Sequence, residues 1–261
     1  MKKRWVLLLT ALATVVLAGC GNSQAQQNKW MNSTTPTIFV HGYGSSSRAE
    51  NSMVRAAKQA GVTSTVAHAQ VAPNGHVILS GPSIRGKRNP IVQVNLQDNR
   101  NTNMAEGSRY IYNVVRKLQR EDHIKSYNVV GHSMGNTDIF AFLNDYGDQP
   151  GMPKLKKQVV LAGAGLTAAR RDQGLYQQIA THLQNLKNNY PHAKVLNIIG
   201  DKGGGTDGRI PNDASRSVKQ MLGDRPASYH QVMIHGSQAQ HSKMHENPKV
   251  FKLINNFLWA K

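Results

Sequence analysis

The pentapeptide Gly131-His132-Ser133-Met134-Gly135 has the G-x-S-x-G pattern of a serine nucleophile. It directly follows the apolar run at 127–130 and directly precedes a helical pattern at 136–146. A sharp turn between strand and helix projects the serine hydroxyl from the edge of a sheet, and the two glycines omit side chains where strand and helix would collide. We therefore predict that Ser133 attacks an acyl group.

A histidine must activate this serine, because a hydroxyl at its ordinary pKa is a weak nucleophile. In sites of this kind the acid and then the histidine follow the serine along the chain. The base should lie between the strand candidate at 229–234 and the helix candidate at 248–258, where the sequence offers His241 and His245. We favour His241, since it leaves a free loop before Pro248, and keep His245 as the alternative.

The acid that orients the imidazole should follow the strand candidate at 194–199. The candidates are Asp201, Asp207 and Asp213. We favour Asp207, because the glycines at 203–205 give it room to reach back to the histidine. Asp201 is nearer to the strand and is the alternative acid; its other role would be to brace the glycine loop.

The tetrahedral intermediate of acyl transfer needs two N–H donors for its oxyanion. One is expected from Met134, the residue after the nucleophile, and one from the loop after an early strand. His41-Gly42-Tyr43 follows the strand candidate at 37–40, so we predict the Tyr43 N–H as the second donor. The His41 side chain is expected to brace this loop. The chemistry needs no metal and no cofactor, and we predict neither.

The elements that must position these residues alternate between strands and helices, which predicts a parallel sheet covered on both faces. We expect one domain over 36–261, without internal repeats. Predicted strands are 37–40, 62–67, 127–130, 158–162, 194–199 and 229–234, and predicted helices are 49–60, 101–122, 136–146, 175–189 and 248–258. The segments 77–79 and 91–94 are expected to pair as an inserted hairpin.

The N-terminus predicts export. Residues 1–19 combine a basic start with an apolar run, which is typical of a signal peptide and too short for a comfortable membrane span. The run ends in Leu17-Ala18-Gly19-Cys20, which resembles a bacterial lipobox, so cleavage before Cys20 and its diacylation are expected. Cys20 is the single cysteine, and residues 20–35 are expected to form a flexible tether.

The charge balance restricts the partners. The chain carries 32 basic and 14 acidic residues, a formal net charge of +18, and removal of residues 1–19, with three basic and no acidic residues, leaves +15. A basic surface attracts polyanions. Because export argues against nucleic acid, anionic lipid head groups and cell-wall polyanions are the expected partners.

Four segments taken together resemble the exported cell-surface α/β-hydrolases of Gram-positive bacteria, a family of unknown function. These segments are 39–44, 130–136, 206–211 and 241–248. The resemblance covers 36–261, and the run Asp207-Gly208-Arg209-Ile210-Pro211 is similar to the acid-bearing segment of many α/β-hydrolases. It implies the α/β-hydrolase fold, a mostly parallel twisted sheet with helices on both faces, and a serine esterase with Ser133, Asp207 and His241 as its triad.

The predicted function is therefore a lipid-anchored serine hydrolase on the extracellular face of the membrane of a Gram-positive bacterium. No long apolar lid is visible in the sequence, which favours a carboxylesterase on short acyl esters. One alternative is a lipase or acyltransferase that uses the same triad. The other is a non-catalytic surface lipoprotein that binds cell-wall polyanions through its basic surface.

Overall fold

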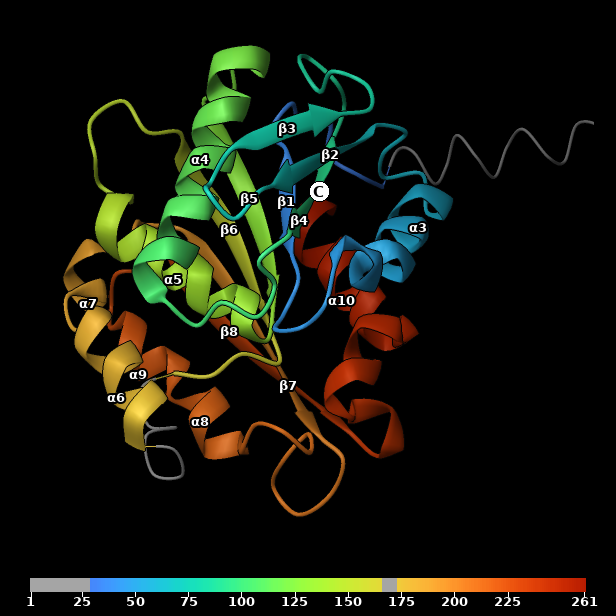
Figure 1. The fold of residues 1–261 in the computed structure, drawn as a ribbon. Helices are drawn as coiled ribbons and strands as arrows, with labels where there is room; N and C mark the ends of the chain where they lie inside the picture. The colour runs from blue at the N-terminus through green and yellow to red at the C-terminus, as the bar shows by residue number, and fades with distance from the viewer. Residues whose placement is uncertain (1–28, 166–172) are drawn as a thin grey trace, which may run out of the picture.

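The fold is built on an eight-stranded sheet (Figure 1). The computed structural model describes residues 29–165 and 173–261, and the strands follow the order β3-β2-β4-β1-β5-β6-β7-β8. All neighbours are parallel except β2 and β3. The strands are β1 (Thr37–Val40), β2 (Val66–Val71), β3 (Val77–Ser80), β4 (Ile91–Leu96), β5 (Ser126–His132), β6 (Lys154–Leu161), β7 (Lys194–Asp201) and β8 (Ser228–His235).

Helices cover both faces of the sheet, because its central strands are apolar on both sides. One face is covered by α3 (Asn51–Gln59) and α10 (Pro248–Trp259). The other is covered by α4 (Met104–Asp122), α5 (Met134–Tyr146), α6 (Gln173–His182), α7 (Leu186–Asn189) and α9 (Val218–Leu222), with α8 (Asn212–Arg216) beside β7. Short 3₁₀ helices are η1 (Ser47–Glu50), η3 (Ser237–Ala239) and η4 (His241–Glu246).

The α/β fold class predicted from the alternation of elements is confirmed, but the inserted hairpin is wrong. Strand β3 pairs antiparallel with β2, and β4 lies between β2 and β1, parallel to both. The apolar run Ile91–Val94 is buried throughout, which suits an interior strand and not an exposed insertion. The second predicted strand also begins later, at Val66, because the Thr63 hydroxyl bonds the Thr65 backbone in a tight turn.

The second half of the predicted tether packs on the domain. Trp30 is 5% exposed, its indole N–H donates to the Ala60 carbonyl at 2.7 Å, and the residue forms an antiparallel bridge with Ala260. The Met31 N–H also donates to the Trp259 carbonyl at 2.7 Å. Trp30 and Met31 therefore pack on the domain although they precede residue 36, because burying a tryptophan removes a large apolar surface from water.

The predicted signal peptide, Cys20 and the first part of the tether lie outside the described residues. Within the described residues, none of the helices has the length and apolar character to cross a membrane.

Candidate active site

The turn from β5 into α5 holds Ser133 in a strained conformation. Its backbone has φ 53° and ψ −125°, a positive φ that residues with a side chain rarely adopt. The turn is tight on both sides: a Cβ atom at Gly135 would lie 2.5 Å from the His41 carbonyl oxygen, and one at Gly131 would collide with the Asn136 side chain. The two glycines thus permit the close strand–helix approach that the sequence predicted.

Three side chains predicted from chain order form a continuous hydrogen-bonded series. The His241 Nε2 lies 2.8 Å from the Ser133 Oγ, and the His241 Nδ1 lies 2.6 Å from the Asp207 Oδ2. Ser133 comes from the β5–α5 turn, Asp207 from the loop after β7, and His241 from the start of η4. This order of contacts suits proton transfer from the hydroxyl to the imidazole.

Asp207 is poised to accept hydrogen bonds as a carboxylate. The residue is 1% exposed, and its Oδ1 accepts the Arg209 and Ile210 N–H groups at 2.8 Å each. Burial acts to raise the pKa of Asp207, but the bond and charge of His241 and the two backbone donors outweigh it and hold the pKa below its ordinary value. The charged carboxylate thus accepts the Nδ1–H of His241, which leaves Nε2 free to accept from Ser133.

The backbone of His241 is held as firmly as its ring. Its N–H donates to the Asp207 carbonyl at 2.9 Å, and its carbonyl accepts from the His132 Nε2 at 3.1 Å. Burial, with His241 and His245 close by, lowers the pKa of His132 to about 3, so the ring is neutral and donates this bond. Sequence reasoning missed this role of His132; the only signal was its place beside the nucleophile.

The two alternative residues make other contacts. The Asp201 Oδ1 accepts the Gly203 N–H at 2.9 Å, a bond that lowers the pKa of Asp201, and its Oδ2 lies 3.9 Å from the exposed His235. It braces the glycine loop. The His245 ring packs edge-on to His132 at a centroid distance of 5.0 Å, and its buried Nδ1 has no hydrogen-bond partner among the described residues.

The loop after β1 approaches the nucleophile closely. A Cβ atom at Gly42 would lie 2.9 Å from the Ser133 Cβ. His41 braces the loop: its Nε2 accepts the Leu96 N–H at 3.0 Å, so the proton is on Nδ1, which donates to the Gly42 carbonyl at 2.9 Å. Burial lowers the pKa of His41, consistent with a neutral ring.

The two predicted oxyanion donors follow directly after Gly42 and Ser133, the two residues that approach each other here. Tyr43 follows Gly42, and Met134 follows Ser133 at the first position of α5. Neither backbone N–H donates to another residue in the described part of the chain, and free donors at a helix N-terminus favour developing negative charge. Within residues 29–165 and 173–261, no cluster of three or more histidine, cysteine or acidic side chains is arranged to hold a metal ion.

Comparisons with known proteins agree with this geometry. A family model described as an alpha/beta hydrolase of unknown function, DUF915, matches residues 24–261. The product of the gene lin2722 of Listeria innocua is similar in structure, with a TM-score of 0.75 and 20% identity, over 86% of this chain and 93% of that one. No protein among those with curated descriptions matches the chain.

Two further solved structures share the fold. A candidate cell surface hydrolase of Lactobacillus plantarum has a TM-score of 0.71 and 18% identity, over 86% of this chain and 91% of that one. Est1E of Butyrivibrio proteoclasticus has a TM-score of 0.54 and 14% identity, over 86% of each chain.

Proposed function

This chain belongs to the alpha/beta hydrolase family DUF915, and from that premise we propose that it is a serine hydrolase of carboxylic esters with Ser133 as nucleophile. The observation that carries the proposal is the hydrogen-bonded series of Ser133, His241 and Asp207, with separations of 2.8 and 2.6 Å, on a turn of positive φ. Side chains from three separate segments meet there in the order that acyl transfer requires.

The reaction proceeds through an acyl-enzyme. His241 takes the proton of Ser133 as the oxygen attacks the ester carbonyl, and the Tyr43 and Met134 N–H groups stabilise the oxyanion. Collapse of the intermediate breaks the ester bond, and His241 returns the proton to the departing alcohol. A water molecule, deprotonated by His241, then attacks the acyl-enzyme, so that the carboxylic acid leaves and the serine regains its proton. Asp207 stabilises the imidazolium in both steps.

We test the nucleophile with Ser133→Ala in a chain that begins at residue 21. Hydrolysis of a short chromogenic ester should fall by about 10⁴-fold or more, because the covalent step is lost. Labelling by a fluorophosphonate should disappear in the same variant. Ser242→Ala, which changes an exposed serine beside His241, is the matched control and should keep both signals. Unlabelled wild-type protein would favour the non-catalytic polyanion-binding lipoprotein instead.

The substrate we propose is a short acyl ester. The absence of a long apolar lid in the sequence supports this substrate class. A series of esters of increasing acyl length should give the highest kcat/KM at the short end, whereas a lipase would favour long chains in emulsions. Product analysis in the presence of an acceptor alcohol separates hydrolysis from acyl transfer.

We also propose that the protein works outside the cell on a lipid anchor at Cys20. The lipobox-like sequence before Cys20 supports the anchor. The fold shared with a candidate cell surface hydrolase is compatible with this location. Metabolic labelling with a radioactive fatty acid should mark the wild-type protein and not Cys20→Ser, and the same variant should appear in the medium.

A further inference from the structure

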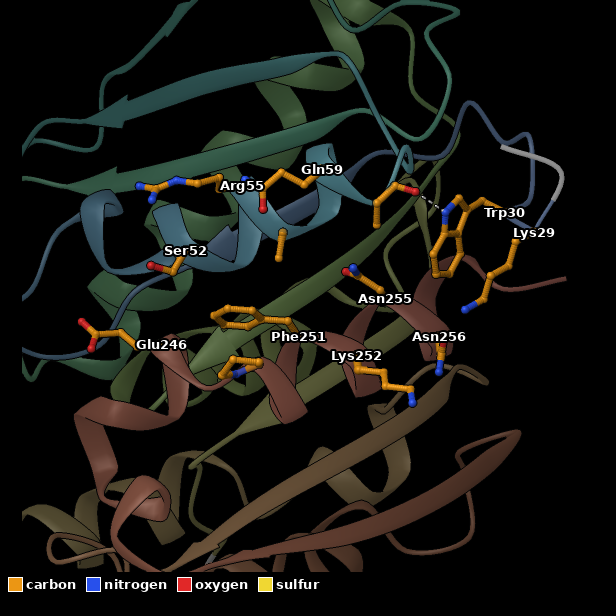
Figure 2. Close-up of a pocket in the computed structure, with 13 residues that line it drawn as sticks. Lys29, Trp30, Ser52, Arg55, Gln59, Glu246, Phe251, Lys252, Asn255 and Asn256 are labelled. Carbon is orange, nitrogen blue, oxygen red and sulfur yellow. Dashed lines mark hydrogen bonds between the residues drawn. The ribbon is translucent and has the colours of Figure 1, made fainter. Parts of the chain in front are cut away.

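A long groove lies between α3 and α10, on the face of the sheet opposite α4 and α5 (Figure 2). Its volume is about 650 Å³. One end lies beside Ser52 and Glu246, the last residue of η4, and the other end lies beside Lys29 and Trp30. The triad uses none of these residues, so the groove is separate from the candidate active site.

The groove combines apolar walls with positive charge. Trp30 and Phe251 supply aromatic surface, and Lys29, Arg55 and Lys252 outnumber the single acidic residue, Glu246. Arg55 and Lys252 are exposed on facing helices, and neither forms an ion pair with any residue of 29–165 or 173–261. Two unpaired cations beside aromatic surface favour a ligand that is both anionic and apolar.

A polar side chain lies at the bottom of the groove. Asn255 lines the groove and is only 6% exposed, yet its amide has no hydrogen bond to another described residue. Figure 2 shows this amide between α3 and α10. Its amide atoms are not among the fully buried side-chain atoms that lack a partner, so they can be reached from the groove. The Asn255 amide can therefore donate a hydrogen bond to a ligand in the groove and accept one from it.

We propose that this groove binds the head group of an anionic phospholipid at the membrane surface. Arg55 lies toward one end of the groove and Lys252 toward the other, and their side chains point in opposite directions (Figure 2), so each would attract a separate phosphate of an anionic membrane surface. The hydroxyls of the head group would bond the Asn255 amide. The first methylenes of the acyl chains would pack on Phe251, whose ring lines the groove (Figure 2).

The position of the groove along the chain agrees with this occupant. Lys29, the first residue that the structure describes, lies at one end of the groove. The proposed anchor at Cys20 is nine residues earlier, a distance that an extended chain spans in at most about 30 Å. An anchored domain would thus keep the groove within reach of the bilayer. A basic site strengthens the membrane attachment that acyl chains provide.

The test uses a chain that begins at residue 21, which retains every described element and lacks the lipid anchor. Its binding is measured by co-sedimentation with vesicles of phosphatidylcholine alone or mixed with phosphatidylglycerol. The double variant Arg55→Glu/Lys252→Glu removes the groove cations. The matched control is Arg85→Glu/Lys87→Glu, which makes the same change of charge at two exposed residues between β3 and β4.

We expect the wild-type protein to bind the mixed vesicles and not pure phosphatidylcholine. The groove variant should bind at least about thirtyfold more weakly, from the usual contribution of two basic residues at an anionic surface. The control should change by less than about threefold. Equal losses in both double variants would mean that binding follows total charge, and the proposal would be wrong.

A second measurement tests the buried amide. Soluble dihexanoyl phosphatidylglycerol is titrated into the protein, and the side-chain amide resonance of Asn255, assigned with Asn255→Ala, is followed by NMR. We expect a saturable shift that the groove variant lacks. An unmoved Asn255 signal, or binding of a glycerol-phosphate wall polymer without binding of vesicles, would overturn the proposal. Hydrolysis of a soluble ester should be unchanged in the groove variant, which verifies its fold.

Discussion

Two carboxyl groups in this protein are equally buried but differ in their hydrogen bonds and in their pKa. Asp207 and Glu50 are each 1% exposed. Asp207 accepts bonds from His241 and two backbone N–H groups, which hold its pKa below the ordinary value against the effect of burial. Neither oxygen of Glu50 has a hydrogen-bond partner among the described residues, and burial raises its pKa to about 8.

The difference shows that burial alone does not make a carboxylate useful. A buried carboxyl stays ionised at neutral pH only where donors replace the water that it has lost. The loop after β7 supplies such donors to Asp207, whereas η1 supplies none to Glu50 from another described residue. A carboxyl that is neutral cannot stabilise an imidazolium, so only Asp207 is equipped to support His241.

The largest effect is expected from Asp207→Asn. The amide cannot hold the Nδ1–H tautomer of His241 or stabilise the imidazolium, so kcat should fall by about 10⁴-fold. Glu50→Gln makes the same chemical change at equal burial and should alter kcat by less than about threefold. Ester hydrolysis is measured on both variants. A comparable loss of kcat in Glu50→Gln would mean that Asp207 has no special role in supporting His241.

A smaller loss of activity is expected from changes at His132, which donates a hydrogen bond to the His241 carbonyl. His132→Leu removes the bond to the His241 carbonyl and should lower kcat/KM by about 10- to 100-fold, because small displacements of a base are costly. His132→Gln keeps an N–H donor at a similar reach and should restore most of the activity. If both variants lose the same amount, packing and not the hydrogen bond accounts for the role of His132.

The Glu50 carboxyl, which has no hydrogen-bond partner among the described residues, should lower the free energy of unfolding at neutral pH. The Glu50 carboxyl ionises near pH 4.5 when unfolded and near pH 8 when folded, so ionisation favours unfolding as pH rises between these values. Glu50→Gln should therefore raise the free energy of unfolding at pH 7 by on the order of 1–3 kcal/mol. Urea unfolding at several pH values measures this gain, which should vanish below pH 4.5.

The smallest effect is expected at Asp201. Its carboxylate bonds the Gly203 N–H in a loop open to solvent, and an asparagine oxygen can accept the same bond. Asp201→Asn should thus change kcat/KM by less than about threefold, as measured on the same ester as Asp207→Asn. A loss as large as that of Asp207→Asn would instead return Asp201 to the role of the acid.

The structure brings together the three side chains that the sequence singled out, and it adds supporting bonds that the sequence did not indicate. Ser133, Asp207 and His241 each follow a strand, and parallel strands bring such positions to one edge. The bond between the His241 N–H and the Asp207 carbonyl joins residues 34 apart in the chain, and no local pattern indicates it. The hydrogen bond from His132 to the His241 carbonyl likewise joins residues that are far apart in the chain.

The errors in the fold have equally physical causes. Alternation and apolar runs identify a strand but not its neighbour, so the sequence predicts that 77–79 and 91–94 pair with each other, whereas the strands that contain them pair with β2. Helices α8 and α9 have five residues each, too few for a periodic pattern to stand out. The sequence places Trp30 in a polar tether, because no local pattern indicates its partner, the Ala60 carbonyl, which is 30 residues away.

The junction of Trp30 and Met31 with Trp259 and Ala260 has a mechanical consequence. It holds the segment before β1 against the C-terminal end of α10, through one bridge and a 2.7 Å hydrogen bond. Tension applied through the preceding chain would load this junction before any strand of the sheet. Its few bonds would yield first, and the segment before β1 would lengthen while Ser133, Asp207 and His241 kept their positions. Drag on a tethered protein would thus be absorbed at an edge that the chemistry does not use.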